Sequence, residues 1–72
     1  MSKYKVYRNG ALITEPTFTF RAIDAFSVPA LQAYRAACAG RVDEQHLIEV
    51  DELISVFVAW QRENGLRIPK PA

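Results

Sequence analysis

The pattern of apolar and polar positions is strongest between residues 47 and 60. At 100° per residue the apolar side chains span an arc of about 200°, wider than the ~100° stripe of a helix that lies on one surface. Such a helix is expected to be central, covered from more than one side. We predict a helix over residues 43–64, capped by Asp43 and ended by Gly65. The apolar arc comprises Leu47, Val50, Leu53, Ile54, Val56, Phe57, Val58 and Trp60.

Two positions near the start of this helix disagree with the pattern. Ile48 falls on the polar side of the wheel, and Glu49 falls within the apolar arc. A bend or break near residues 49–51 would reconcile both positions, so the beginning of the helix is predicted less tightly than its end.

The N-terminal residues carry a hairpin signal. Asn9-Gly10 stands between two β-rich runs and is a preferred pair for a two-residue type I′ turn, because both central residues need positive φ. The turn predicts a buried face containing Val6 and Ile13, and leaves an apolar pair, Tyr7 and Leu12, partly exposed. The predicted cross-strand pairs are Arg8 with Ala11, Tyr7 with Leu12, Val6 with Ile13 and Lys5 with Thr14.

A third strand is predicted after Pro16, which ends the second strand because proline cannot donate to a ladder. Residues 17–22 alternate polar and apolar, so Phe18 and Phe20 share one face. We expect these two rings to point inward and to cover one flank of the long helix.

A shorter helix is predicted over residues 24–40. Asp24 and Ser27 are both candidate N-caps, and Pro29 favours Ser27 because proline is tolerated in a first helical turn. Gly40 is suited to the position after the helix. The apolar stripe Leu31, Tyr34 and Cys38, with alanines at positions 30, 33 and 37 beside it, is expected to cover the second flank of the long helix.

The predicted architecture is therefore α+β, a single domain of the order βββαα. Residues 1–22 form the hairpin and third strand, 24–40 and 43–64 form an antiparallel helical pair, and 65–72 form an extended tail from which Leu66 and Ile68 are expected to fold back onto the core. A chain of 72 residues leaves a modest core, so homodimerisation or partner binding would add stability.

Charge is unevenly distributed, although the net charge is only +1. Residues 1–41 contain six basic and two acidic side chains, and residues 42–72 contain three basic and six acidic ones. We expect a dipolar molecule. Neither a membrane-spanning apolar run nor a secretory signal is seen, and the single cysteine cannot form an internal disulfide, which together favour a reducing, cytoplasmic setting.

The sequence lacks a catalytic or metal-binding signature. His46 with Glu49 does not complete a zinc site, and Ser27 and Ser55 do not lie in a nucleophile elbow. The three glycines are accounted for by turns and caps rather than by a phosphate loop. We therefore predict a nonenzymatic protein that needs neither cofactor nor metal.

Two charged stretches each admit two interpretations. The acidic residues between 43 and 52 either compensate the helix dipole or form a docking patch for a basic partner, or a mimic of nucleic-acid charge. The cations and aromatics of the hairpin are typical of single-stranded nucleic-acid platforms, but they are also suited to contacting a protein or to protecting a sheet edge.

From Phe18 onward the chain resembles small uncharacterised proteins of tailed bacteriophages. The shared features are an F-x-h-x-A-x-D start (h, hydrophobic), a proline- and alanine-containing helix, and a last helix that ends in W-Q-x-x-N before a short basic tail with prolines. The resemblance implies a phage or prophage origin, and with it the cytoplasm of a bacterial host, but it supplies no biochemical activity. The residues that carry it are Phe18, Phe20, Ala22, Asp24, Pro29, Phe57, Trp60, Gln61, Asn64 and Pro69.

These observations favour a phage-derived, noncatalytic accessory protein that binds and modulates a larger host or phage protein, such as host RNA polymerase or a defence complex. The alternatives are a nucleic-acid-binding regulator that uses the hairpin and a structural or morphogenesis component. The predicted partner-binding residues are Lys3, Lys5, Tyr7, Arg8, Leu12, Asp51, Glu52 and Trp60.

Overall fold

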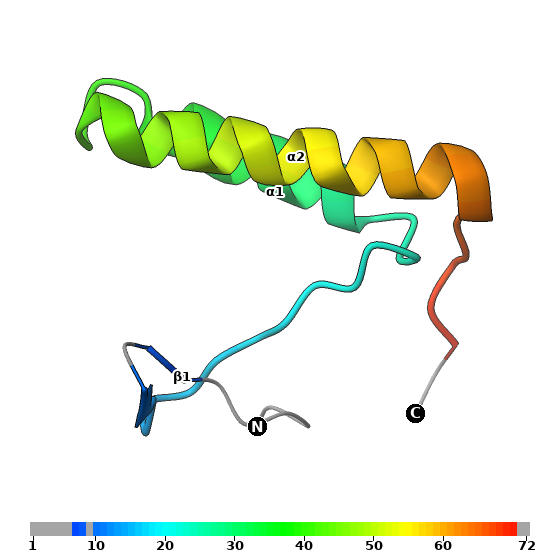
Figure 1. The fold of residues 1–72 in the computed structure, drawn as a ribbon, viewed down its shortest axis with the longest axis horizontal. Coiled ribbons are helices and arrows are strands. Elements are labelled where there is room, and N and C mark those ends of the chain that lie inside the picture. Colours follow the sequence, from blue (N-terminus) through cyan, green and yellow to red (C-terminus); the bar gives the residue numbers. More distant parts are fainter. Residues whose placement is uncertain (1–6, 9, 71–72) are drawn as a thin grey trace.

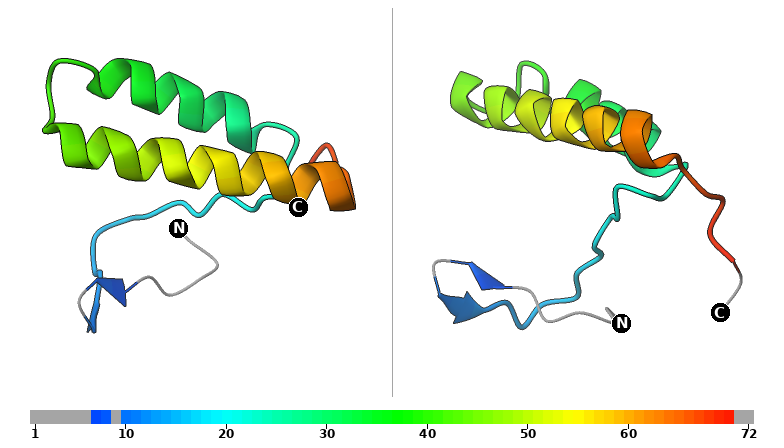
Figure 2. Two further views of the ribbon diagram at one scale, coloured as in Figure 1. Left: turned by 45° about the horizontal axis from the view of Figure 1, so that its top comes forward. Right: turned by 45° about the vertical axis from the view of Figure 1, so that its right-hand side comes forward.

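An antiparallel pair of helices dominates the computed structural model, which describes residues 7–8 and 10–70. The elements are β1 (Tyr7–Arg8), β2 (Ala11–Leu12), α1 (Ser27–Cys38) and α2 (Glu44–Asn64). Both views in Figure 2 place α1 and α2 side by side. Residues 13–26 run from the small hairpin to the start of α1, as Figure 1 shows. We refer to residues 10–20 as the arm.

The helix α2 is continuous over its 21 residues, so the break expected near residues 49–51 does not occur. Ile48 and Glu49 are both exposed, and neither requires the helix to turn. Asp43 caps the start as predicted, because its carboxylate accepts a hydrogen bond from the His46 backbone N–H at 2.9 Å. Gly65 ends the helix at φ +81°, a conformation that costs glycine little.

The helix α1 begins at Ser27, three residues later than the predicted boundary. Asp24 instead forms a turn ahead of the helix, in which its carboxylate accepts from the Phe26 N–H and its backbone oxygen accepts from Ser27 Oγ, both at 2.8 Å. Pro29 lies in the first turn, where its missing N–H has no helical partner to lose. Gly40 has φ +78° after Ala39, as the predicted helix end requires.

The predicted βββαα fold is wrong, because the described chain is mostly helical. The hairpin pairs only Tyr7 with Leu12 and Arg8 with Ala11, in the predicted register, while the predicted pairs that involve Lys5 and Val6 lie outside the described residues. Residues 17–22 form no strand. A ladder two residues long offers a third strand almost no edge to join, and Pro16 removes a donor at the point where pairing would continue.

The two phenylalanines of the arm do not cover α2. Phe18 is 76% exposed and Phe20 is 36% exposed. Their rings instead contact each other edge to face, with centroids 5.0 Å apart. Among the described elements, β1 and β2 contact only each other and α1 contacts only α2. The hairpin is therefore separate from the helical core.

The core lies between the two helices and is small. Its buried apolar members are Leu31 and Cys38 from α1 and Val50 from α2. The alanines at positions 33 and 37 are exposed, so the contact uses the larger side chains of α1 rather than its small ones. α1 covers only one flank of α2. The prediction that α2 is central is therefore wrong, and part of its apolar arc faces outward.

A polar joint ties the end of α2 to the start of α1. Ser27 is fully buried, and its hydroxyl lies 3.3 Å from Gln61 Nε2. The same Gln61 amide donates to the Ala22 backbone oxygen at 2.8 Å. Because Ser27 Oγ donates to the Asp24 backbone oxygen, the buried hydroxyl is satisfied as both donor and acceptor. We call Ala22, Asp24, Ser27 and Gln61 the joint.

The C-terminal tail is attached beside this joint by its backbone. The Arg67 N–H donates to the Ile23 oxygen and the Ala25 N–H donates to the Arg67 oxygen, each at 2.7 Å, which makes a single parallel bridge. Leu66 and Ile68 were expected to fold onto the core, but they are 55% and 74% exposed. Main-chain hydrogen bonds, rather than apolar burial, thus position the tail.

We predict that Gln61→Ala lowers the free energy of unfolding by about 1–2 kcal/mol, because the Ser27 hydroxyl and the Ala22 oxygen lose their donor. The measurement is urea denaturation followed by circular dichroism. The matched control is Gln32→Ala, an exposed glutamine of α1 that is expected to change stability little. Equal denaturation midpoints for the two variants would contradict the role of the joint.

We also predict opposite outcomes for two large-to-alanine substitutions. Leu31→Ala removes a core side chain and should cost about 2–4 kcal/mol of unfolding free energy. Phe18→Ala removes an exposed ring and should cost under about 1 kcal/mol. Thermal unfolding of both variants tests this order. A Phe18→Ala variant that is less stable than Leu31→Ala would show that Phe18 belongs to the core and would contradict the prediction.

Candidate functional site

The surface of the described chain carries an unusual amount of apolar side chain. The molecule exposes 6199 Å², whereas a compact monomer of 8.1 kDa exposes about 4,500 Å². The difference, about 1,700 Å², is similar to the total area buried in a standard protein interface. The exposed large apolar side chains are Leu12, Phe18, Phe20, Phe26, Tyr34, Val42, Ile48, Leu53, Val56, Trp60, Leu66 and Ile68.

Ten of these twelve side chains belong to three separate parts of the chain, while Tyr34 lies on α1 and Val42 in the loop before α2. Leu12, Phe18 and Phe20 lie on β2 and the arm. Ile48, Leu53, Val56 and Trp60 lie on α2. Phe26, Leu66 and Ile68 lie on either side of the parallel bridge formed by Arg67. Single exposed apolar residues need no explanation, but groups of this size are typical of interaction sites.

The predicted partner-binding residues do not form one surface. Lys3 and Lys5 lie outside the described residues, and for Tyr7 and Arg8 the structure describes the backbone pairing. Leu12 is exposed on β2, which contacts neither helix. The other three predicted residues, Asp51, Glu52 and Trp60, are all exposed on α2. The structure therefore divides the set between the hairpin and α2.

Asp51 is engaged within the chain. Arg35 of α1 donates from Nε to Oδ1 at 2.9 Å and from its Nη2 to Oδ2 at 3.3 Å, which forms a bidentate ion pair across the two helices. The hydrogen bond and the charge of Asp51 raise the pKa of Arg35. Asp51 is thus partly neutralised, and it is a weaker candidate for binding a basic partner than the neighbouring Glu52.

A second contact joins the helices near the start of α2. Tyr34 Oη and His46 Nε2 share a hydrogen bond of 2.9 Å, and their rings meet edge to face. The neighbouring Cys38 thiol, by hydrogen bonding and by charge, raises the pKa of Tyr34. Because the lone histidine holds the two helices together here, a structural role accounts for its position.

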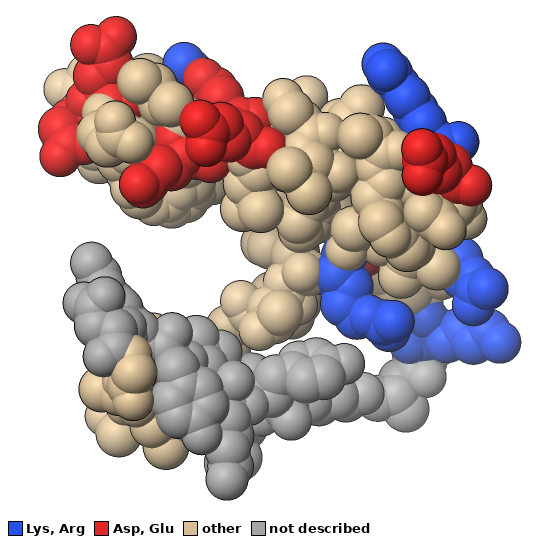
Figure 3. All heavy atoms as spheres, in the orientation of Figure 1, with Lys and Arg blue, Asp and Glu red and all other residues tan. Residues whose placement is uncertain are grey.

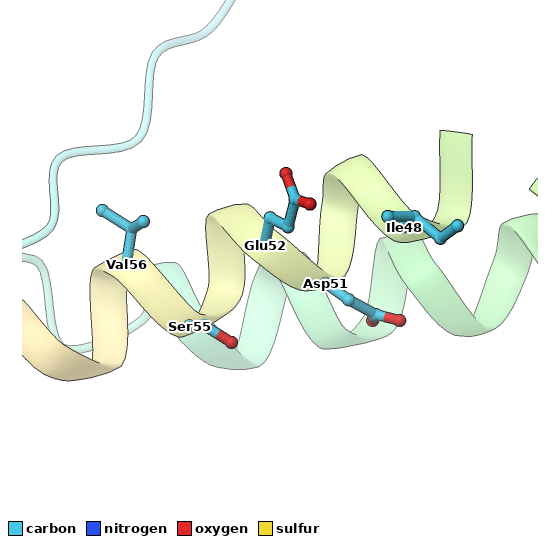
Figure 4. A pocket seen from close by; sticks show the side chains of 5 residues that line it. All are labelled: Ile48, Asp51, Glu52, Ser55 and Val56. Atoms are coloured by element: carbon cyan, nitrogen blue, oxygen red, sulfur yellow. The ribbon is translucent and has the colours of Figure 1, made fainter. Parts of the chain in front are cut away.

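An open depression lies along α2, and all five residues that line it come from this helix, as Figure 4 shows. Glu52 and Val56 point to one side, one helical turn apart, Asp51 and Ser55 point to the other, and Ile48 lies between these two directions. A hollow formed by one helix lacks the enclosing walls of a small-molecule site. We therefore interpret it as part of a contact surface.

Charged side chains separate along the helical pair. Figure 3 shows acidic side chains gathered over one end and basic ones around the other. The acidic end, where the loop joins α1 to α2, contains Asp43, Glu44, Glu49, Asp51 and Glu52 together with Arg41. The basic end, at the joint and tail, contains Arg21, Arg62, Arg67 and Lys70 together with Asp24 and Glu63. The dipole therefore runs along the helices.

Within residues 7–8 and 10–70, the histidine, cysteine and carboxylate side chains do not gather in any group of three suited to a metal ion. In the same part of the chain, neither helix is apolar enough over sufficient length to cross a bilayer. These findings leave the exposed apolar groups and the charged ends as the features with functional potential.

Comparison with family models, with curated proteins and with solved structures finds no match for this chain. The resemblance to tailed-bacteriophage proteins therefore stays a prediction. Three of its ten residues, Ala22, Asp24 and Gln61, belong to the joint. Asn64 lies nearby and donates to the Trp60 backbone oxygen at 3.0 Å. In this structure these positions act in folding.

Sequence reasoning missed the role of Gln61. The wheel places it about 20° from Val50, among apolar side chains, where a polar group needs a partner. That position could have identified Gln61 as a buried hydrogen-bond donor. Its partners could not have been identified, because Ala22 and Ser27 precede it by 39 and 34 residues.

We predict a small favourable coupling energy between Arg35 and Asp51, since both side chains are partly exposed to solvent, which screens their charges. A double-mutant cycle with Arg35→Ala and Asp51→Ala measures this coupling energy. It should decrease in high salt. Pairing Arg35→Ala with Glu52→Ala is the control, and an equal coupling energy there would contradict a specific ion pair.

Proposed function

We propose that this chain is a noncatalytic, phage-derived accessory protein that binds a larger host or phage protein through its arm. The observation that carries the proposal is a set of three large apolar side chains, Leu12, Phe18 and Phe20, that stay exposed on the arm, whose strand β2 contacts neither helix. A partner that covers these side chains would remove them from water, which is the main favourable term in protein association.

The arrangement of the arm supports binding to a protein. Phe18 and Phe20 form an edge-to-face pair, which presents a preassembled aromatic surface. Aromatic side chains are enriched at the centres of protein interfaces, where they supply much of the binding energy. Host RNA polymerase or a defence complex remains the target class that we propose.

Nucleic-acid binding is a second candidate, and the basic end favours it. Four cations, two of them on the tail, gather there and are exposed. Arginine and lysine side chains grouped in this way are suited to phosphate contacts. The acidic end opposes this function, because it would repel a nucleic acid that extends along the helices.

The proposal predicts that a photo-crosslinking phenylalanine analogue at position 18 captures one defined protein in cells of the bacterial host. The control carries the same analogue at Gln32, an exposed position of α1. Leu12→Ala, combined with the analogue at position 18, should reduce the captured amount severalfold. Mass spectrometry identifies the product, and nuclease treatment distinguishes a protein from a nucleic acid. Equal labelling from positions 18 and 32 would contradict the proposal.

A further inference from the structure

The exposed face of α2 carries three large apolar side chains in register with one another. Leu53, Val56 and Trp60 are separated by three and then four residues, the spacing of the contact positions of paired helices. They are 44%, 64% and 38% exposed, respectively. We call these three residues the α2 seam. Glu49 and Glu63 occupy the next positions of the same repeat, so the apolar seam is limited to three residues.

The neighbourhood of the seam is suited to a close approach. On the side of the helical pair where Tyr34 meets His46, α1 presents the exposed Ala37, about 60° from Tyr34 on the helical wheel. Small side chains beside large ones permit two such surfaces to interdigitate. One broad face of the helical pair is therefore apolar.

The surface area is consistent with a partner of similar size. A standard interface buries about 800 Å² on each partner. The chain, with its arm included, exposes about 1,700 Å² more than a compact monomer of its mass, which exceeds the area that one partner contributes to such an interface.

The charge separation is suited to a second copy of this chain whose α2 runs antiparallel to the first. If α2 of a second copy lies antiparallel to the first, the acidic end of each copy meets the basic end of the other. A parallel arrangement would bring acidic end to acidic end. A twofold axis generates the antiparallel arrangement automatically, and it presents the same seam from both copies.

We propose that a second copy of this chain covers the α2 seam, forming an antiparallel twofold dimer of helical hairpins. Val56 lies at the twofold axis, and Leu53 of each copy packs against Trp60 of the other. The dimer uses Leu53, Val56 and Trp60 of α2, whereas the protein partner proposed above uses Phe18 of the arm. The register also places Glu49 of each copy opposite Glu63 of the other, and this like-charge contact keeps the wild-type dimer weak.

The experiment is sedimentation velocity of the full chain over a range of concentrations at low salt. We expect a concentration-dependent monomer–dimer equilibrium. Val56→Asp, at an exposed position that the monomer tolerates, should weaken the dimer at least tenfold while circular dichroism stays unchanged. A wild-type chain that remains monomeric at millimolar concentration, or an undiminished dimer in a folded Val56→Asp variant, would overturn the proposal.

The register is tested by charge reversal. Glu49→Lys should tighten the dimer several-fold, because it converts two like-charge contacts into two Lys–Glu pairs. The double variant Glu49→Lys/Glu63→Lys should lose that gain. The control, Glu52→Lys, makes the same charge change at the same end but off the seam, so it should weaken the dimer by reducing the charge difference between the ends. Glu49→Lys and Glu52→Lys variants of equal affinity would overturn the antiparallel register.

One further measurement distinguishes dimerisation through the α2 seam from partner binding through the arm. The Val56→Asp chain, when it carries the crosslinking analogue at position 18, should still capture the protein partner. Loss of dimerisation with retained capture supports two independent surfaces. Loss of both in a folded chain would overturn the separation between the seam and the arm.

Discussion

The side-chain amide of Gln61 is the contact on which the arrangement of the rest depends. It reaches from the last turns of α2 to a buried hydroxyl and a backbone oxygen at the entrance to α1. A buried polar group left without a partner costs about 1–3 kcal/mol. The two helices therefore cannot slide along each other without losing the hydrogen bonds of Gln61 at that cost. The segment before α1 and the tail after α2 are both positioned by the same region. One polar cluster therefore sets the relative placement of α1, α2, the segment before α1 and the tail.

The small apolar core makes this polar contact more important than it would be in a larger protein. Leu31, Cys38 and Val50 alone form the buried apolar set in the described chain. Burial of a full aliphatic side chain contributes about 1.5–3 kcal/mol, whereas ordering the chain costs a comparable amount for each residue. Such a molecule has a small free energy of unfolding, and contacts with other molecules can increase it. The exposed apolar groups on the arm and on α2 are understandable in these terms.

The sequence predicted those features that local chemistry determines. Asn9-Gly10 gave the hairpin register, Asp43 gave the helix cap, and Gly40 gave the end of the first helix, because each requirement is set by a few neighbouring residues. The prediction of a third strand was wrong for a different reason. Alternation at Phe18 and Phe20 is satisfied equally by an extended segment whose rings contact each other. Periodicity specifies which side chains share a face, but it does not specify whether that face meets a partner. For the same reason, the wide apolar arc of α2 did not reveal that only one flank is covered, and the predicted site residues could not be placed on a common surface.

The single attachment of the arm has a mechanical consequence. Since β1 and β2 contact neither helix in the described structure, the hairpin is connected to the helical pair there through residues 13–26. It can swing through a range of orientations without breaking a contact of the helical pair. A partner that captures it must then restrict that freedom, at a cost of about 0.5–1.5 kcal/mol for each side chain that becomes ordered. The freedom also has a benefit. The exposed apolar side chains of the arm can adapt their orientation to target surfaces of different shape, while the two helices keep their own geometry.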